Sequence, residues 1–399
     1  MLWRGRGICC AKLALPPDRF TATSGKLLKA PDMANHPKYL VVKGSGGAGL
    51  GDKIQALIVA AMYSRLTNRL LYIDWKDRTY GDATRNYFLD LFEPVGLQVA
   101  QRLPTSGRTA PATWEGRLAL SLDDIVVADG FSWNRSGGRA RYSFDQTRLD
   151  YEEDVLVMWE MDQYPLVRTL YEARFAGELS HPPTTTDTQA QAQFFRDNFV
   201  VNAGVQSRVD EFIADHFTTR PVVGVHVRLT DESEACRRNP TLPAFLRAAA
   251  RVLRESHATA IFLASDNRNV IDRFRFEFGA DQVLTIDKWL PQAGMHLHKN
   301  PQCPDLLQSA RDALVDACLL GRCDWLVGSH ESAFSRLAAI FSTAPPERQL
   351  LLFPRVPLAV RLRSAVRRVL PWQYVSLSRL TQARERAMND TSPPTVTNT

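Results

Sequence analysis

A histidine and an arginine close an apolar run at Gly224-Val-His226-Val-Arg228. In a strand, His226 and Arg228 lie two residues apart and project from the same face. The apolar run predicts a buried strand, so the guanidinium needs an anion or a carboxylate as its partner. A diphosphate suits it, because the planar guanidinium donates two parallel charge-assisted hydrogen bonds. The alternative is structural, with Arg228 paired internally to Asp231 and His226 hydrogen-bonded in the core.

Two carboxylates lie close to other predicted buried elements. Ala264-Ser265-Asp266-Asn267 follows a buried strand and precedes a helix. Asp266 can accept a hydrogen bond from a ribose hydroxyl or a guanine N–H, or it can simply cap the helix. Asp316 lies on the apolar face of a later helix. We therefore expect its carboxylate to be enclosed and paired.

The segment Ser332-Ala333-Phe-Ser335-Arg336 starts a predicted helix directly after a short strand and a turn of small residues. The first amides of a helix have no intrahelical acceptor and point outwards, so such a terminus can bind phosphate. Helix capping alone also explains Ser332.

A glycine-rich turn, Gly44-Ser-Gly-Gly47-Ala-Gly49-Leu-Gly51, joins the first strand to a helix that Asp52 is expected to cap. Its first part matches the dinucleotide-binding pattern, and Asp74 ends the next strand. The ATPase phosphate-loop pattern fails, because Asp52 stands where lysine is required and would repel a pyrophosphate at the helix start. Three interpretations stay open: contact with a sugar or nucleotide, a tight structural turn, or NAD(P) or FAD binding.

Metal ligands are not expected. The sequence contains no Asp-x-Asp pair, and its histidines and cysteines show no metal-ligand spacing. Arg228 and a helix terminus would then have to neutralise a leaving diphosphate. The six cysteines form no CxxC pair, which predicts a reducing, cytoplasmic compartment without disulfides.

Predicted strands and helices alternate along the chain and determine where the candidate site residues lie. In the first half we expect strands at 38–43, 70–74 and 154–159, a helix at 52–68 and a mainly helical stretch at 189–217. In the second half we expect strands at 221–228, 260–264, 282–286, 325–327 and 349–352, with helices at 243–255, 269–278, 305–320 and 333–342. This alternation predicts parallel sheets covered by helices on both faces, with ligands beyond the carboxyl ends of the strands.

Length and composition favour two globular domains. The 399 residues are 45% hydrophobic and 23% charged, and no apolar run is long enough to span a bilayer. The predicted segments are a disordered 1–37, an N-terminal domain at 38–217, a C-terminal domain at 218–355, a basic helical segment at 356–388 and a disordered tail at 389–399.

The net charge of +6 lies in one segment. Residues 355–390 hold eight arginines against Glu385 and Asp390, so the rest of the chain is neutral. A nucleic-acid groove, which needs many distributed phosphate contacts, is therefore disfavoured. Apolar residues accompany these arginines at helical spacing. The segment could lie on an anionic membrane surface, or pack back across the domains as a terminal helix.

Five segments, in this order, resemble the fucosyltransferase family of nodulation protein Z and the α1,6-fucosyltransferases. They are Gly49-Leu-Gly-Asp-Lys53, Leu71-Tyr-Ile-Asp-Trp75, Gly224-Val-His-Val-Arg228, Ile261-Phe-Leu-Ala-Ser-Asp266, and the stretch from Ala313-Leu-Val-Asp316 to Ser332-Ala-Phe-Ser-Arg336. The resemblance implies a GT-B fold, in which two Rossmann-like domains with parallel sheets face each other across a cleft, the N-terminal one on the acceptor side. It also implies inverting, metal-independent transfer of fucose from GDP-fucose to an oligosaccharide or glycolipid hydroxyl, without a further cofactor.

The resemblance also implies roles for single residues. Arg228 would hold the β-phosphate beside His226, and Asp266 (with its neighbour Asn267) and Asp316 would meet the guanosine. Ser332 and the residues that follow it (Ala333, Ser335 and Arg336) would meet the phosphates.

The general base would be Asp231, Glu232 or Glu234. Leu229 stands where the α1,6 members carry a second basic residue. Two other functions stay open on the sequence: an NAD(P)-dependent oxidoreductase, and a catalytically silent nucleotide- or glycan-binding protein. The acceptor, the linkage and the sugar on the nucleotide are not specified, and GDP-mannose is an alternative donor.

Overall fold

The structure is a computed structural model. It describes residues 37–44, 47–131, 141–146, 148–159, 187–217, 221–229, 240–292, 295, 297 and 300–353. The predicted segments at 356–388 and 389–399, and all but the last residue of 1–37, lie outside these ranges. Across the described ranges, every helix is too short or too polar to cross a bilayer.

The first half of the chain contains a parallel sheet with the strand order β2-β1-β5-β4. Its strands are β1 (Tyr39–Lys43), β2 (Leu70–Asp74), β4 (Thr109–Ala110) and β5 (Val155–Met158). Helix α1 (Leu50–Leu66) connects β1 to β2, the crossover that parallel neighbours need. The three predicted strands of this half are confirmed to within one residue at each end.

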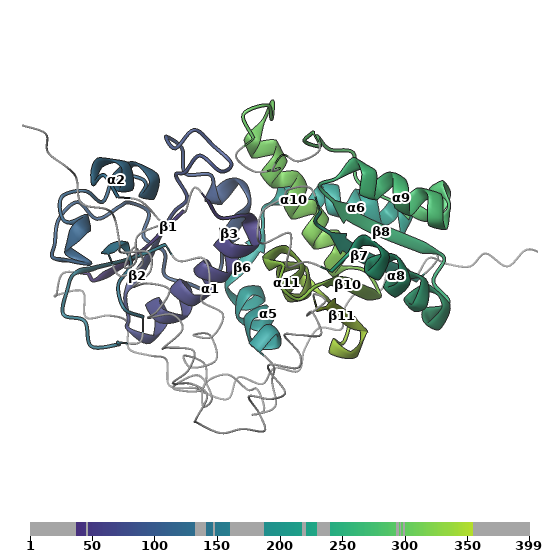
Figure 1. The fold of residues 1–399 in the computed structure, drawn as a ribbon. Coiled ribbons are helices and arrows are strands. Elements are labelled where there is room, and N and C mark those ends of the chain that lie inside the picture. Colours follow the sequence, from purple (N-terminus) through teal and green to yellow (C-terminus); the bar gives the residue numbers. More distant parts are fainter. Residues whose placement is uncertain are drawn as a thin grey trace, which may run out of the picture. The chain divides into compact units, whose positions relative to one another are not determined.

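The second half contains a five-stranded parallel sheet with the order β11-β10-β7-β8-β9. Its strands are β7 (Val222–Val227), β8 (Ala260–Ser265), β9 (Val283–Leu284), β10 (Trp325–Ser329) and β11 (Gln349–Leu352). The helices between them are α8 (Leu242–Ser256), α9 (Arg268–Phe278), α10 (Leu306–Gly321) and α11 (Ala333–Phe341), as Figure 1 shows. All five predicted strands are confirmed, although β9 is shorter than expected.

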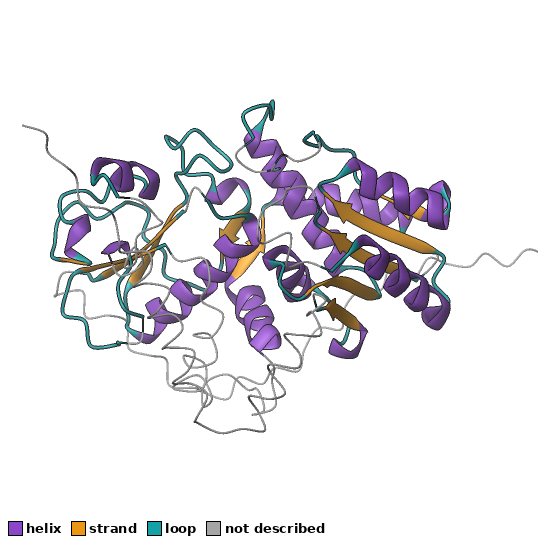
Figure 2. Ribbon diagram, in the orientation of Figure 1, coloured by secondary structure: helices purple, strands orange, loops and turns teal. Residues whose placement is uncertain are grey.

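Helices cover both faces of this sheet (Figure 2). Val223, Val225 and Val227 of β7 pack in one apolar cluster with side chains of α8 and α9. Val222 of β7 and Phe262 of β8 belong to the other cluster, which includes α10 and α11. Successive strand residues point to opposite faces, so an unbroken apolar strand is what a sheet buried on both sides requires.

The predicted helical stretch at 189–217 consists of two helices with a short strand between them. These are α5 (Asp187–Asn198), β6 (Phe199–Val201) and α6 (Ala203–His216), and β6 pairs antiparallel with β3 (Phe92–Pro94). Helix α6 packs against α10, and α5 packs against α11. The predicted domain boundary after residue 217 falls between α6 and β7 and stays a prediction.

Shorter elements complete the described chain. They are α2 (Leu122–Ala128) and single 3₁₀ turns at Phe88–Asp90, Ala112–Trp114, Ala280–Gln282 and Pro346–Arg348.

The start of α1 differs from the prediction. Gly49 is its N-cap residue and no side chain caps the helix, so the expected capping by Asp52 is wrong. Asp52 lies instead in the first turn. The Leu50 amide donates to the Tyr80 hydroxyl at 3.2 Å, so a side chain distant in sequence serves an amide at the start of the helix.

Candidate functional site

A pocket with about 630 Å³ of empty space draws its lining from both halves of the chain. The first half contributes the start of α1 and Tyr80, and the second contributes the carboxyl ends of β7 and β8, the loop after β9, and parts of α10 and α11. The charged and aromatic side chains in the lining are Asp52, Tyr80, His226, Arg228, Asp266, Lys288, Asp316 and Phe334. The position agrees with ligand binding beyond the carboxyl ends of parallel strands.

His226 is buried beside α11. Its Nδ1 lies 2.7 Å from the Ser335 hydroxyl, and its ring packs on Phe334 with centroids 4.8 Å apart. The Ser335 hydroxyl already accepts the Ser329 amide at 2.9 Å, so its own proton is available to Nδ1. This arrangement favours the tautomer with the hydrogen on Nε2.

The His226 imidazole is neutral in the folded protein. Burial, with smaller contributions from Arg228 and Lys288, lowers its pKa to about 3. It therefore supplies a hydrogen-bond donor without adding a third positive charge beside the two cations.

Arg228 lines the pocket just beyond the end of β7. Its charge acts on two other residues of the pocket wall, Tyr80 and His226. The sequence prediction that His226 and Arg228 lie together at a strand end is confirmed. The arginine thus lies where a phosphate entering the pocket would meet it.

The N-termini of α1 and α11 meet at this pocket. A β-carbon on Gly51 would lie 2.5 Å from the carbonyl carbon of Ala333 and 2.8 Å from the Phe334 amide nitrogen, which shows how closely the two backbones approach. Each helix start carries amides without intrahelical acceptors and the positive end of a helix dipole. Two such ends favour an anion in the pocket, although Asp52 opposes it from the first turn of α1.

A buried carboxylate anchors the segment that forms the first-half side of the pocket. Asp77 accepts from Lys53 at 2.7 Å, from the Tyr87 hydroxyl at 2.9 Å and from the Thr79 amide at 2.8 Å. A β-carbon on Gly44 would overlap this carboxylate, so the glycine after β1 is required by packing. The network ties the loop after β2 to α1 and thereby supports Tyr80.

Asp316 of α10 is 2% exposed and forms an ion pair with Lys288, so the prediction that it is enclosed and paired is confirmed. Burial raises the pKa of the Asp316 carboxyl, and the Lys288 ammonium opposes that rise. Within the described part of the chain, Oδ1 of Asp316 accepts no hydrogen bond. Lys288 was not singled out in the sequence, although it follows the predicted strand at 282–286 by only two residues.

Asp266 lines the pocket, but it does not cap the helix that follows. Asn267 does so, accepting the Asn269 amide at 2.9 Å and donating to the Leu229 carbonyl at 3.1 Å. The alternative in which Asp266 is only a cap is therefore wrong. Asn267 is not part of the pocket lining.

The start of α11 contributes fewer residues to the pocket than the sequence predicted. Ser332 caps the helix by accepting the Ser335 amide at 3.4 Å, and Ala333 and Phe334 line the pocket. Ser332, Ser335 and Arg336 are not in the lining. Gly47, from the glycine-rich turn, is exposed and also outside it.

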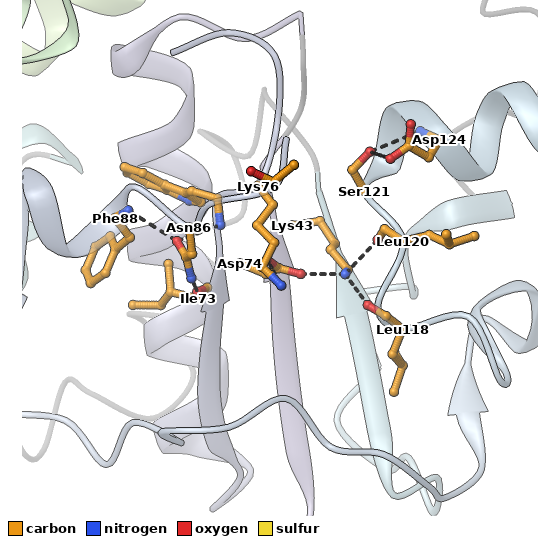
Figure 3. A network of polar contacts seen from close by, with 12 residues as sticks. Lys43, Ile73, Asp74, Lys76, Asn86, Phe88, Leu118, Leu120, Ser121 and Asp124 are labelled. Carbon is orange, nitrogen blue, oxygen red and sulfur yellow. Dashed lines mark hydrogen bonds and ion pairs between the residues drawn. The ribbon is translucent and has the colours of Figure 1, made fainter. Parts of the chain in front are cut away.

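Asp74, which completed the dinucleotide-binding pattern, is occupied elsewhere. The Lys43 ammonium lies 2.6 Å from Oδ2 of Asp74 and also donates to the carbonyls of Leu118 and Leu120 (Figure 3). Both side chains are buried and neither lines the pocket. The carboxylate that a dinucleotide-binding protein offers to a ribose is therefore closed off by a lysine.

Two further predictions concern the general base and metal binding. The candidate bases Asp231, Glu232 and Glu234 lie in 230–239, outside the structure. Within the described ranges, no three histidine, cysteine or acidic side chains gather as metal ligands.

The nodulation protein Z (NodZ) family model matches residues 184–350. The predicted resemblance to this family is confirmed. Nodulation protein Z of Azorhizobium caulinodans is 28% identical over 310 residues, which cover 72% of this chain and 85% of the relative. Nodulation protein Z of Bradyrhizobium diazoefficiens is 26% identical over 324 residues, which cover 74% of this chain and 77% of the relative.

Solved structures agree with the fold. A NodZ alpha-1,6-fucosyltransferase soaked with GDP-fucose superposes with a TM-score of 0.51 at 21% identity, covering 77% of this chain and 93% of that one. A variant of Arabidopsis thaliana FUT1 in complex with GDP gives a TM-score of 0.50 at 15% identity, covering 80% of this chain and 71% of that one. The predicted GT-B-like architecture with two parallel sheets is confirmed.

Proposed function

We propose that this protein is an inverting fucosyltransferase that moves fucose from GDP-fucose to a hydroxyl of an oligosaccharide or glycolipid, without a metal. The observation that carries the proposal is the pocket in which Arg228 joins the two helix starts that meet at Gly51 and Ala333. The similarity to nodulation protein Z supports the same conclusion, because one solved NodZ was soaked with GDP-fucose.

The cationic side of the pocket suits the leaving diphosphate. When the bond between the sugar C1 and the β-phosphate oxygen breaks, negative charge grows on that phosphate and positive charge on the sugar ring. A fixed guanidinium and preoriented helix amides stabilise this charge more strongly in the transition state than in the bound substrate. Arg228 is assigned to the β-phosphate, and the first amides of α11 to the same diphosphate.

The acceptor hydroxyl attacks C1 from the face opposite the diphosphate, and its proton passes to a carboxylate. Asp231, Glu232 and Glu234 stay the candidates proposed from the sequence. Among the described residues, Asp52 is a further candidate because it lines the pocket at the start of α1. A carboxylate there is unsuited to a phosphate but suited to accepting a hydroxyl proton.

The nucleoside is assigned to the second-half wall of the pocket, beyond the strand ends. Asp266 and Asp316 supply carboxylate acceptors there, and His226 supplies a neutral donor. Leu229 packs in the apolar cluster of α8 and α9, so this position provides no second cation to the phosphates.

A transfer assay tests the proposal directly. GDP-fucose and chito-oligosaccharides are incubated with the full chain, and mass spectrometry detects the fucosylated product, with GDP-mannose in a parallel reaction. Thermal unfolding with GDP, GDP-fucose and NAD(P)H measures binding, since a ligand at 100 times its Kd stabilises by about 2.7 kcal/mol. Stabilisation by GDP without transfer or donor hydrolysis would identify a nucleotide-binding protein. Stabilisation by NAD(P)H alone would contradict the proposal.

The cellular setting is also part of the proposal. We assign the protein to the cytoplasm, with its basic segment at 356–388 touching an anionic membrane near a lipid-linked acceptor. The compartment is assigned from the cysteine pattern of the sequence, which has no CxxC pair. Truncation from Val356 tests the membrane contact: loss of binding to anionic liposomes with unchanged stability supports it, and loss of folding contradicts it.

A further inference from the structure

The pocket has two chemically different parts. Arg228 and the helix starts at Gly51 and Ala333 form the part suited to phosphates. Lys288 and Asp316 form the other part, which places an ammonium next to a carboxylate in the same lining. The second part is suited to a ligand edge that carries an acceptor beside a donor.

Lys288 has donors to spare. It follows β9 at the carboxyl edge of the sheet, and its side chain is 8% exposed. Asp316 is the single hydrogen-bond acceptor that the described residues provide to its ammonium, which carries three hydrogens. An almost fully buried ammonium with only one partner is costly unless a ligand supplies further acceptors.

Asp316 likewise has an acceptor to spare. Its Oδ2 takes the Lys288 hydrogen bond, while Oδ1 is buried and accepts none from the described residues. The pair therefore offers both a donor and an acceptor to a molecule in the pocket.

We propose that Lys288 selects the base by donating a hydrogen bond to the 6-oxo group of guanine. This inference rests on the proposed use of a guanosine nucleotide. On the neighbouring edge of guanine, the N1–H and 2-amino groups are donors that match the Asp316 carboxylate. Adenine reverses this order, since it carries a donor at position 6 and an acceptor at position 1. A Lys–Asp pair would then face two mismatches at once.

Base analogues on the full-length wild-type chain test the proposal without any variant. Calorimetric titration compares GDP with the 5′-diphosphate of 6-thioguanosine, which keeps the N1–H and 2-amino donors and replaces only the 6-oxo oxygen by sulfur, a weak hydrogen-bond acceptor. Weakening a hydrogen bond to a charged donor in this way should lower the affinity by about tenfold. Equal affinities for the two nucleotides would overturn the proposal.

The Lys288→Met variant then assigns the effect to one side chain. In it, GDP and the 6-thioguanosine nucleotide should bind equally well, to within about twofold, while inosine diphosphate, which lacks only the 2-amino group, should still bind more weakly than GDP. Persistence of the wild-type preference for GDP over the 6-thioguanosine nucleotide would overturn the role of Lys288.

Lys43→Met is the matched control, because it also removes a buried lysine from an aspartate ion pair but lies outside the pocket. It should keep the wild-type ratio of nucleotide affinities despite lowering stability. A changed ratio in this control would mean that any loss of stability alters base selection, which would also overturn the assignment. If Lys288→Met does not fold, the wild-type analogue comparison decides.

Failure of this inference is distinguishable from failure of the proposed function. A chain that binds GDP and transfers fucose but does not discriminate against the 6-thioguanosine nucleotide refutes only the role of Lys288. A chain that shows no saturable binding of GDP refutes both.

Discussion

Gly51 and Ala333 lie so close that a single added methyl group on Gly51 would overlap the backbone of Ala333. The two residues belong to the first turns of α1 and α11, helices from opposite halves of the chain. This contact keeps both helix starts at one pocket. It makes the glycine a structural requirement of the site.

Gly51→Ala should therefore separate the two helix starts. Overpacking of this kind costs about 1–3 kcal/mol of unfolding free energy, and GDP affinity should fall with it. Chemical denaturation and calorimetric titration measure the two effects. Gly204→Ala is the matched control, since Gly204 is likewise the second residue of its helix but lies outside the pocket, and a β-carbon there meets only Asn202 Oδ1, at 3.4 Å. Equal effects of the two substitutions would contradict the role of the Gly51–Ala333 contact.

Arg228→Ala should lower kcat/KM by on the order of 10²–10³, about 3–4 kcal/mol, because the charge on the departing diphosphate loses its bidentate partner. Arg228→Lys should restore little of this, since an ammonium cannot donate in the same planar fork. Steady-state transfer kinetics on folded variants measure both. A loss of less than about fivefold in Arg228→Ala would remove the arginine from the mechanism.

Asp52→Asn distinguishes a base from a phosphate contact. Removing a negative charge from the first turn of α1 should leave GDP binding unchanged or tighten it. If Asp52 accepts the acceptor proton, kcat should fall by about 10²–10⁴. Titration with GDP and single-turnover transfer measure the two quantities. An unchanged kcat would exclude Asp52 and leave Asp231, Glu232 and Glu234 as the candidates.

His226 should make stability depend on pH. Its pKa is about 3 in the folded protein against 6.5 in the unfolded chain, so the unfolded chain takes up the proton first as pH falls. The free energy of unfolding should therefore decrease from pH 6.5 towards pH 3, by up to about 1.4 kcal/mol per pH unit.

Urea denaturation between pH 7 and pH 5 measures this slope, with His226→Gln as the comparison. The variant lacks the titrating group, so its stability should vary less steeply over the same range. Parallel curves for the two proteins would show that the imidazole is not held neutral.

Much of the second sheet could be predicted from the sequence because its strands are apolar on both faces. The runs at 221–228 and 260–264 match β7 and β8 closely, and the polar residues after them, Arg228 and Asp266, line the pocket. The rule that ligands bind beyond the carboxyl ends of parallel strands was enough to select them.

What the sequence did not predict depends on contacts between distant residues. Lys288 becomes notable only because α10 brings Asp316 to it from 28 residues away. Asp52 is not the cap because α1 begins two residues earlier than expected, with Gly49 in the N-cap position. The cap of α9 moved one residue along, to Asn267, since local sequence does not fix where a strand ends to within one residue.

The Lys43–Asp74 pair has a consequence for classifying chains of this type. Glycine spacing after a first strand describes only the shape of a turn, which many unrelated sites share. The last residue of the first strand, Lys43 in this chain, distinguishes it from a dinucleotide-binding protein. A lysine at the end of the first strand pairs with the aspartate at the end of the second strand, so that carboxylate is not available to a ribose. Chains that carry both residues should therefore not be classified as oxidoreductases on their glycine spacing alone.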